Sequence, residues 1–405
     1  MAQPKRKQPE RKRAPRRERE AEREHELVLG MPAARFLAQV WQKKPLLIRG
    51  GVPNFCDPLT PEELAGLACE DGVESRLVRE KGGAHPWEVT WGPHPEERFR
   101  KLPKKGWTLL VQEVNRWVPE IAMLLDRVAF LPSVRIDDVM VSFAAPGGSV
   151  GPHVDSYDVF LVQGKGRRRW RYDTKPTKDV RFVPNLDLRI LERFTPEADE
   201  VLEAGDVLYI PPGFAHHGIA ESDCLTYSIG FRSPSEGELR AAFAADRARL
   251  ASALLADPPL VPQDNAGAIP RTLLARIRDI VRAERASDEE IDRWFASFST
   301  RLAPGHAIEP PARPLKDVLG RLARDQRVRR TEEGRFAFLP RPKGACFLYV
   351  GGEEIAIDRT ASKLAQLIAS KRSFRGTELL ACAKSASARA LVSDLFARGA
   401  LLFDH

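Results

Sequence analysis

Apolar and polar positions follow two different periods along this chain. Between residues 139 and 231, short apolar runs with alternating polar positions are separated by turns, which is the pattern of strands in a sandwich or barrel. After Pro234 the composition changes to Ala, Arg, Leu and Glu, and the apolar residues recur at helical spacing. We therefore expect the barrel to end near Pro234, with three amphipathic helices after it, over residues 238–255, 271–286 and 288–302.

The segment ahead of the barrel mixes helices and strands. Residues 25–37 predict a short helix with Phe36 and Leu37 facing inward, and residues 60–69 predict a second helix with Thr60 as its N-cap. The other expected elements are strands over 75–79 and 87–91, helices over 109–118 and 120–129, and a strand over 139–143.

A proline-rich linker over residues 304–314 precedes the last part of the chain. The expected order of elements is typical of a winged-helix module: strands over 335–339, 346–350 and 354–357, helices over 361–370, 376–383 and 387–398, and a strand over 401–403. Basic residues do not gather on the third of these helices, so a protein-interaction or scaffold role is favoured over DNA binding.

Composition restricts the class of protein. With 405 residues, 43% of them hydrophobic, the chain can bury a core in two or three domains. No apolar run is long enough to cross a bilayer, and the N-terminus lacks the apolar part of a signal peptide, so a soluble, cytoplasmic protein without membrane contact is expected. Five scattered cysteines without C-x-x-C spacing indicate reduced thiols.

The net charge of +8 is concentrated at the N-terminus. Residues 1–25 contain ten Lys or Arg against five Glu, which leaves only +3 for the rest of the chain. Such a tail either contacts an anionic partner such as ribosomal RNA or is a solvated, disordered extension. Composition leaves both interpretations open.

Two distant stretches carry candidate metal ligands. His153 and Asp155 lie two positions apart in a stretch with strand character, so both side chains leave the same face of a sheet. His216 follows an apolar run that ends in a Pro-Pro-Gly turn, and its neighbour His217 competes for the same role with opposite strand parity. Two imidazoles and one carboxylate are the ligand set of non-haem iron(II) oxygenases, although zinc accepts the same set.

Three motifs around these residues carry a resemblance to a known family: WQKKPLLIRG (41–50), GPHVDSYDVFLVQGKGRRRWR (151–171) and GDVLYIPPGFAHHG (205–218). In this order they resemble the JmjC-type, cupin-like 2-oxoglutarate oxygenases. They are most similar to the bacterial ribosomal oxygenases, which hydroxylate an arginine of a large-subunit ribosomal protein.

The resemblance implies an α+β chain and a homodimer. A double-stranded β-helix, the jelly-roll barrel of cupins and JmjC proteins, would be followed by a helical dimerisation domain and a C-terminal winged-helix-like domain. The expected parts are a basic tail (1–25), the oxygenase domain (26–234), the dimerisation domain (235–303) and the winged-helix-like domain (304–405).

The resemblance also implies roles for single residues. His153, Asp155 and His216 match the ligands of Fe(II), and Arg168 matches the cation that binds the far carboxylate of the cosubstrate 2-oxoglutarate. One position departs from the family, because a small hydroxyl residue of the relatives is Ala144 here.

Strand alternation independently favours Arg168 as the inward cation. It places Arg168 on one face with two aromatic residues, Trp170 and Tyr172. The other arginines of this run, Arg167, Arg169 and Arg171, are expected on the opposite face, and Arg167 and Arg169 are interpreted as part of a solvated basic face.

An arginine substrate would need acidic and aromatic side chains around it. Tyr157 and Asp158 directly follow the ligand strand, and Asp138 precedes the barrel. One of the two aspartates is a candidate to pair with the substrate guanidinium. Both are equally well interpreted as ordinary turn or strand-edge carboxylates.

Two other functions remain open at this point. The same fold could hydroxylate a histidine or remove an N-methyl group, because the outcome depends on which substrate carbon faces the metal. A non-catalytic ribosome- or nucleic-acid-binding protein would have an incomplete ligand set or no cosubstrate cation, and neither defect is present.

Overall fold

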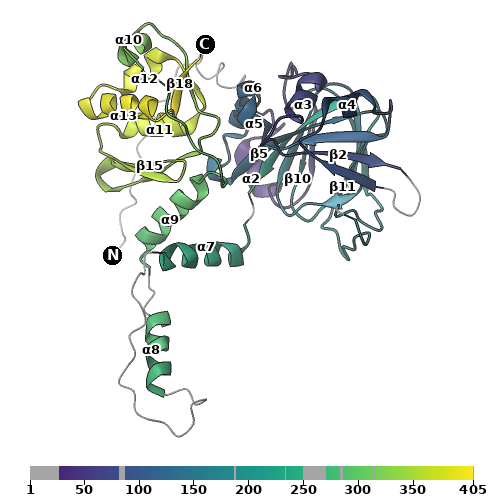
Figure 1. The fold of residues 1–405 in the computed structure, drawn as a ribbon, viewed down its shortest axis with the longest axis horizontal. Coiled ribbons are helices and arrows are strands. Elements are labelled where there is room, and N and C mark those ends of the chain that lie inside the picture. The colour runs from purple at the N-terminus through teal and green to yellow at the C-terminus, as the bar shows by residue number, and fades with distance from the viewer. Residues whose placement is uncertain are drawn as a thin grey trace, which may run out of the picture. The chain divides into compact units, whose positions relative to one another are not determined.

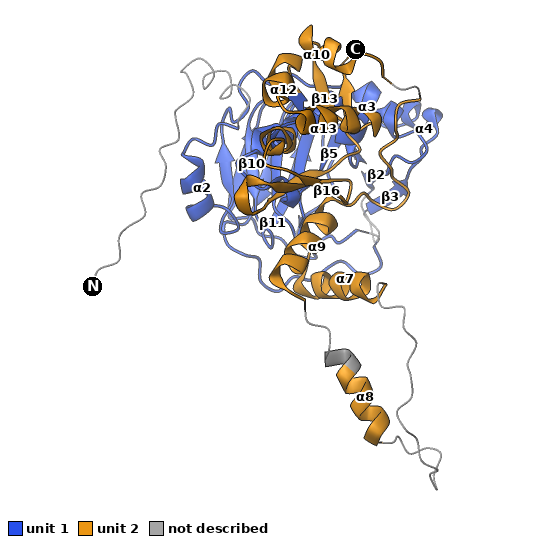
Figure 2. Ribbon diagram, turned by 90° about the vertical axis from the view of Figure 1, so that its left-hand side faces the viewer, with its two compact units in different colours: residues 1–232, 370–373 blue, residues 233–369, 374–405 orange. Residues whose placement is uncertain are grey.

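The computed structural model describes residues 27–81, 87–186, 188–232, 234–249, 271–282, 286–312 and 315–404. The expected basic tail and residues 250–255 of the first predicted helix lie outside these ranges. The chain forms two compact units, one of residues 1–232 with 370–373 and one of residues 233–369 with 374–405 (Figure 2). No helix of the described part is long and apolar enough to span a membrane.

Two antiparallel sheets build the first unit and confirm the predicted jelly roll (Figure 1). The larger sheet has the order β1 (Leu46–Ile48), β10 (Val207–Ile210), β7 (Val159–Gln163), β12 (Cys224–Phe231), β5 (Ile136–Ala144), β4 (Trp107–Val111), β2 (Ser75–Glu80) and β3 (Trp87–Trp91). The smaller sheet has the order β6 (His153–Val154), β11 (Ala215–Ala220), β8 (Arg168–Tyr172) and β9 (Ala198–Leu202).

The helix predicted over residues 109–118 is wrong in its first half. Residues Trp107–Val111 form β4, which pairs with both β2 and β5. Leu109, Leu110 and Val111 are consecutive and all buried, because a central strand is covered on both faces. A strand that is buried on both faces therefore consists of consecutive apolar residues, and such a run also fits helical spacing.

The other helices of this unit are short. Ala33–Gln39 (α2) buries Phe36 as predicted, whereas Leu37 stays 38% exposed and does not face inward. Thr60 caps α3 (Pro61–Leu67) in a complete capping box with Glu63. The rest are α4 (Glu96–Arg100), α5 (Val114–Trp117), α6 (Pro119–Ala122) and two 3₁₀ helices, Met123–Val128 and Ser133–Arg135. The single helix expected over 120–129 is divided between α6 and the first 3₁₀ helix.

An aromatic cluster forms the core behind the larger sheet. Phe36 lies edge-on to Tyr209 at a centroid distance of 5.2 Å, and Trp41 stacks on the same Tyr209 at 5.5 Å. Phe160 and Phe231 complete the cluster at 5.8 Å from each other. Burial of each such ring contributes about 1.5–3 kcal/mol, so the N-terminal helix is anchored to β7, β10 and β12 of the larger sheet.

The second unit begins with three helices, as predicted: α7 (Glu236–Ala248), α8 (Arg271–Arg282) and α9 (Asp288–Thr300). Capping boxes start α7, through Ser235 and Glu238, and α9, through Ser287 and Glu290. Ile277 of α8 is 39% exposed, so an apolar residue of this amphipathic helix has little cover within the described chain.

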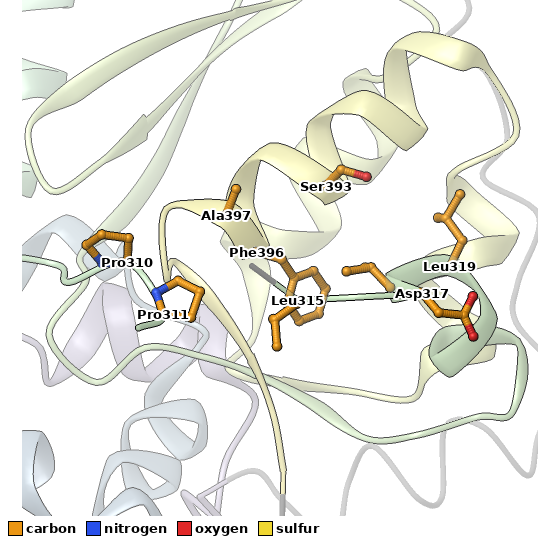
Figure 3. A pocket seen from close by; sticks show the side chains of 9 residues that line it. Pro310, Pro311, Leu315, Asp317, Leu319, Ser393, Phe396 and Ala397 are labelled. Carbon is orange, nitrogen blue, oxygen red and sulfur yellow. The ribbon is translucent and has the colours of Figure 1, made fainter. Parts of the chain in front are cut away.

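The winged-helix part contains every predicted element in order: β14 (Phe336–Pro340), β15 (Cys346–Val350), β16 (Glu353–Ile357), α11 (Ser362–Ser370), α12 (Gly376–Cys382), α13 (Ala386–Ala397) and β18 (Leu401–Phe403). The sequence did not predict α10 (Val318–Ala323), β13 (Val328–Arg330) or β17 (Ser373–Phe374). Between α10, α13 and the proline-rich linker lies a groove of about 640 Å³ (Figure 3), lined by Pro310, Pro311, Leu315, Asp317, Val318, Leu319, Ser393, Phe396 and Ala397.

Candidate metal centre

Antiparallel pairing of two strands brings the three candidate ligands together. His153 of β6 pairs directly with His216 of β11, and Asp155 follows β6 by one residue. Oδ2 of Asp155 lies 3.9 Å from Nε2 of His153 and 3.5 Å from Nε2 of His216. One ligand atom from each residue fits within 4.8 Å of the others, and this is the one such group among the described residues.

Backbone carbonyls orient both imidazoles. Nδ1 of His153 lies 2.9 Å from the carbonyl oxygen of Gly151, and Nδ1 of His216 lies 3.1 Å from that of Phe214. A carbonyl only accepts hydrogen bonds, so each Nδ1 carries the hydrogen and each Nε2 keeps its lone pair. In each ring, the nitrogen with the lone pair is therefore Nε2, which lies close to Asp155.

The electrostatics suit a cation. Burial, together with the nearby His153, lowers the pKa of His216 to about 4, so this imidazole is neutral at pH 7. Two imidazoles and one carboxylate on one side of a common point match a facial ligand set that leaves other coordination positions free. The residues present thus fit a divalent metal.

Arg168 is the cation of the same barrel. Its strand β8 alternates as predicted, with Arg168, Trp170 and Tyr172 buried. Arg168 is 3% exposed, and its guanidinium lies 5.0 Å from the Trp170 ring, whose centroid is 5.9 Å from that of His216. Trp170 therefore links the cation to the metal ligands on one face of the smaller sheet.

The guanidinium of Arg168 has no acidic partner among the residues that the structure describes. It makes only long contacts to neutral oxygens, at 3.3 Å to Ser142 Oγ, 3.4 Å to Thr226 Oγ1 and 3.4 Å to the carbonyl of Gly218, and its Nε is buried without a partner. No carboxylate of the described residues lies within ion-pair distance of it. Burial lowers its pKa, and such an uncompensated cation is costly unless an anion binds.

The opposite face of β8 is neutralised by the protein itself. Nε of Arg169 lies 3.0 Å from Glu221, and its Nη1 lies 3.1 Å from Asp199. Arg171 approaches Asp199 at 3.3 Å. The predicted outward orientation is confirmed, but these arginines are ion-paired rather than simply solvated.

The three candidate substrate residues lie in different surroundings. Tyr157 is 40% exposed, and desolvation together with the Asp155 and Asp138 carboxylates raises its pKa. Asp138, on β5, accepts a hydrogen bond from the backbone N–H of Glu113 at 2.9 Å. Asp158 is fully buried instead.

Both carboxylate oxygens of Asp158 are occupied within the core. They accept hydrogen bonds from the Tyr209 hydroxyl at 2.6 Å and from Nε2 of Gln42 at 3.0 Å. Asp158 therefore has the surroundings of a structural carboxylate, and only Tyr157 and Asp138 remain candidates for substrate contact.

Two hydroxyls near Arg168 escaped the sequence analysis. Ser142 of β5 and Thr226 of β12 are direct cross-strand partners, and both lie next to its guanidinium. Ala144, the position that departs from the family, is buried two residues further along β5. Ser142 and Thr226 are 84 positions apart in the sequence, so only the pairing of β5 with β12 reveals that they act together.

Comparison with known proteins agrees with this geometry. The chain is 40% identical over 295 residues to the "Ribosomal protein uL16 3-hydroxylase" of Escherichia coli (strain K12), which covers 72% of this chain and 77% of the relative. The chain belongs to the bacterial ribosomal oxygenases. Residues 123–239 match the family described as JmjC domain, and residues 282–402 match the ROXA-like winged helix.

Other ribosomal oxygenases extend the likeness. The "Probable ribosomal oxygenase" of Haemophilus influenzae is 44% identical over 205 residues, half of each chain. The X-ray structure of E. coli ycfD matches with a TM-score of 0.77 at 34% identity, over 94% of this chain and all of that one. A structure of the E. coli ribosomal oxygenase with cobalt and 2-oxoglutarate matches with a TM-score of 0.74 at 33% identity, over 94% of this chain and 99% of that one.

Proposed function

We propose that this protein is an Fe(II)- and 2-oxoglutarate-dependent oxygenase that hydroxylates an arginine side chain of a large-subunit ribosomal protein. The observation that carries the proposal is the buried Arg168, in the barrel that also holds His153, Asp155 and His216. Within the described ranges this cation has no acidic partner. A metal site alone would fit many enzymes, whereas this pairing fits a dicarboxylate cosubstrate. The relative in E. coli is named as a uL16 hydroxylase, and a similar ribosomal oxygenase of E. coli has been solved with cobalt and 2-oxoglutarate.

Each residue of the barrel would then have one task. His153, Asp155 and His216 hold Fe(II), which together with 2-oxoglutarate supplies the oxidising power for an unactivated C–H bond. Arg168 binds the far carboxylate of the cosubstrate, a charge-assisted contact worth about 1.5–3 kcal/mol. Ser142 and Thr226 orient the guanidinium from the facing sheet.

The substrate side of the site uses Tyr157 and Asp138. A cationic arginine side chain is attracted to a partly exposed ring and to carboxylates beside it. Tyr157 lies in the field of two carboxylates, Asp155 and Asp138. An arginine that stacks on Tyr157 would thus be held next to the metal ligands.

The assembly follows from the second unit. We infer that residues 235–303 form a homodimer interface, because α8 keeps the apolar Ile277 39% exposed. Substitution Ile277→Asp is expected to shift the protein from dimer to monomer in sedimentation velocity. Asp279→Lys, a charge change at an exposed position about 160° around the helix from Ile277, should leave the dimer intact. A monomeric wild-type protein would contradict the inference.

The proposal also covers the domain boundaries, the RNA partner and the location in the cell. Residues 26–234 would be the oxygenase domain and residues 304–405 a winged-helix-like scaffold. The basic residues 1–25 would contact ribosomal RNA, and an enzyme of ribosomal proteins would work in the cytoplasm.

The decisive experiment is turnover with iron loaded under anaerobic conditions. Succinate release and product mass would be followed with 2-oxoglutarate and a panel of ribosomal peptides that contain arginine, histidine or methylated lysine. An added oxygen atom on arginine supports the proposal, and the same addition on histidine or loss of a methyl group would assign one of the alternative reactions. Bound metal and cosubstrate without turnover on any peptide would contradict the arginine substrate.

A further inference from the structure

A hydrogen bond joins the loop ahead of β6, the strand of the ligand His153, to β11, the strand of the ligand His216. Nε2 of His217, on β11, lies 2.9 Å from the hydroxyl oxygen of Ser149. The same hydroxyl oxygen accepts a hydrogen bond from the backbone N–H of Gly151 at 3.0 Å. The carbonyl of Gly151 in turn accepts from Nδ1 of the ligand His153 at 2.9 Å. A continuous chain of hydrogen bonds thus runs from His217 to His153.

The two metal-binding imidazoles differ in how firmly they are held. The side chain of His216 is 2% exposed and belongs to a six-residue strand inside the smaller sheet. The side chain of His153 is 24% exposed, and its strand β6 has two residues and lies at the sheet edge, where it pairs with β11 alone. Packing and strand pairing therefore fix His216 well and His153 poorly.

Ser149 and His217 offset this difference. Ser149 is 2% exposed, so its hydroxyl has no free access to water. His217 leaves β11 on the face opposite to His216, as strand alternation requires, and is therefore not a ligand itself. The start of the loop is held separately, by backbone hydrogen bonds of Gly147 and Gly148 to Ala220. The contact between Ser149 and His217 lies further along the loop, close to Gly151, whose carbonyl orients the His153 ring.

We propose that Ser149 and His217 are positioning residues for the metal ligand His153. Their contact fixes the Gly151 carbonyl, which sets the rotation of the His153 ring and so directs Nε2 toward the point shared with Asp155 and His216. The inference rests on the metal centre of the proposed function. Hydrogen-bond partners behind a metal-ligating histidine typically change metal affinity about 10–100-fold when they are removed.

The test is a Co(II) titration of the metal-free, full-length protein. Ser149→Ala and His217→Phe are each expected to weaken Co(II) binding about tenfold and to change the visible absorption of the bound Co(II). The double variant should be no weaker than the worse single variant, because both substitutions break one chain of contacts. Ser149→Thr keeps a hydroxyl and should restore binding close to that of the wild type.

A matched control separates positioning from general destabilisation. Ser75 is also a 2%-exposed serine, and its hydroxyl donates to the carbonyl of Ala68 at 3.4 Å. It lies on β2 of the larger sheet, whereas the metal ligands belong to the smaller sheet. Ser75→Ala should leave Co(II) affinity unchanged. The melting temperature of metal-free Ser149→Ala should equal that of Ser75→Ala.

The outcomes distinguish the two levels of the argument. Wild-type Co(II) affinity in both Ser149→Ala and His217→Phe, additive losses in the double variant, or an equal loss in Ser75→Ala would overturn the positioning role. If His217→Phe does not fold, Ser149→Ala decides alone. Co(II) binding that survives His153→Ala would instead overturn the metal centre itself.

Discussion

Asp158 and Arg168 are both buried in the barrel, but their surroundings differ. Asp158 accepts hydrogen bonds at 2.6 Å and 3.0 Å from Tyr209 and Gln42, and Arg135 lies 3.7 Å away. In the described part of the chain, the Arg168 guanidinium has only neutral hydrogen-bond neighbours, at 3.3 Å or more, and its buried Nε has no partner. Partners compensate much of the cost of burying a charge, as at Asp158, whereas a buried charge that lacks them provides a site for a ligand of opposite charge.

The largest effect is expected from substitution of a metal ligand, since these residues lie in the same barrel as Arg168. Asp155→Ala removes the carboxylate shared by both imidazoles, so turnover should fall below detection and Co(II) binding should be lost. Succinate release and Co(II) titration would measure both. Activity retained in this variant would mean that the metal lies elsewhere.

Removal of the unpaired cation should affect binding and not stability. Arg168→Met is expected to raise KM for 2-oxoglutarate about ten- to hundredfold, from the loss of about 1.5–3 kcal/mol. Its urea midpoint should stay the same or rise, since a buried cation without a counterion is removed. Arg169→Met, the neighbour that pairs with Glu221 and Asp199, is the control and should leave KM unchanged. Equal KM values for the two variants would remove the distinction.

Removal of the paired anion should have the opposite signature. Asp158→Asn places an amide opposite the donor Nε2 of Gln42, so the free energy of unfolding should fall by about 1–3 kcal/mol. KM for the peptide and for 2-oxoglutarate should not change. Denaturation in urea and steady-state kinetics would measure both, and a selective rise in peptide KM would return Asp158 to the substrate site.

The smallest effect is a dependence on pH. Burial raises the pKa of Asp158 above its ordinary value, although Tyr209 and Gln42 oppose the shift. The native state therefore keeps the proton at pH values where the unfolded chain has lost it, so this carboxyl's contribution to stability declines as pH rises through that window. The stability advantage of the wild type over Asp158→Asn should narrow from about pH 4 upward. An advantage that widens with pH would contradict the raised pKa.

Local patterns predicted part of this molecule well. The N-cap Thr60, and the alternation of Arg168, Trp170 and Tyr172, depend on residues a few positions apart, so the sequence contains the whole signal. The helix predicted over 109–118 failed because an apolar run that fits helical spacing becomes a strand once both its faces are covered.

The sequence by itself determined the ligand types, their spacing and the face of β8 that points inward, because strand alternation and turn chemistry are local properties. Only the tertiary structure decided which charges are already paired. Asp158 met Tyr209 and Gln42, Arg168 met Ser142 and Thr226 but no acid, and Ser149 met His217. These contacts join residues 26 to 116 positions apart, and only the pairing of strands in two packed sheets brings such residues together.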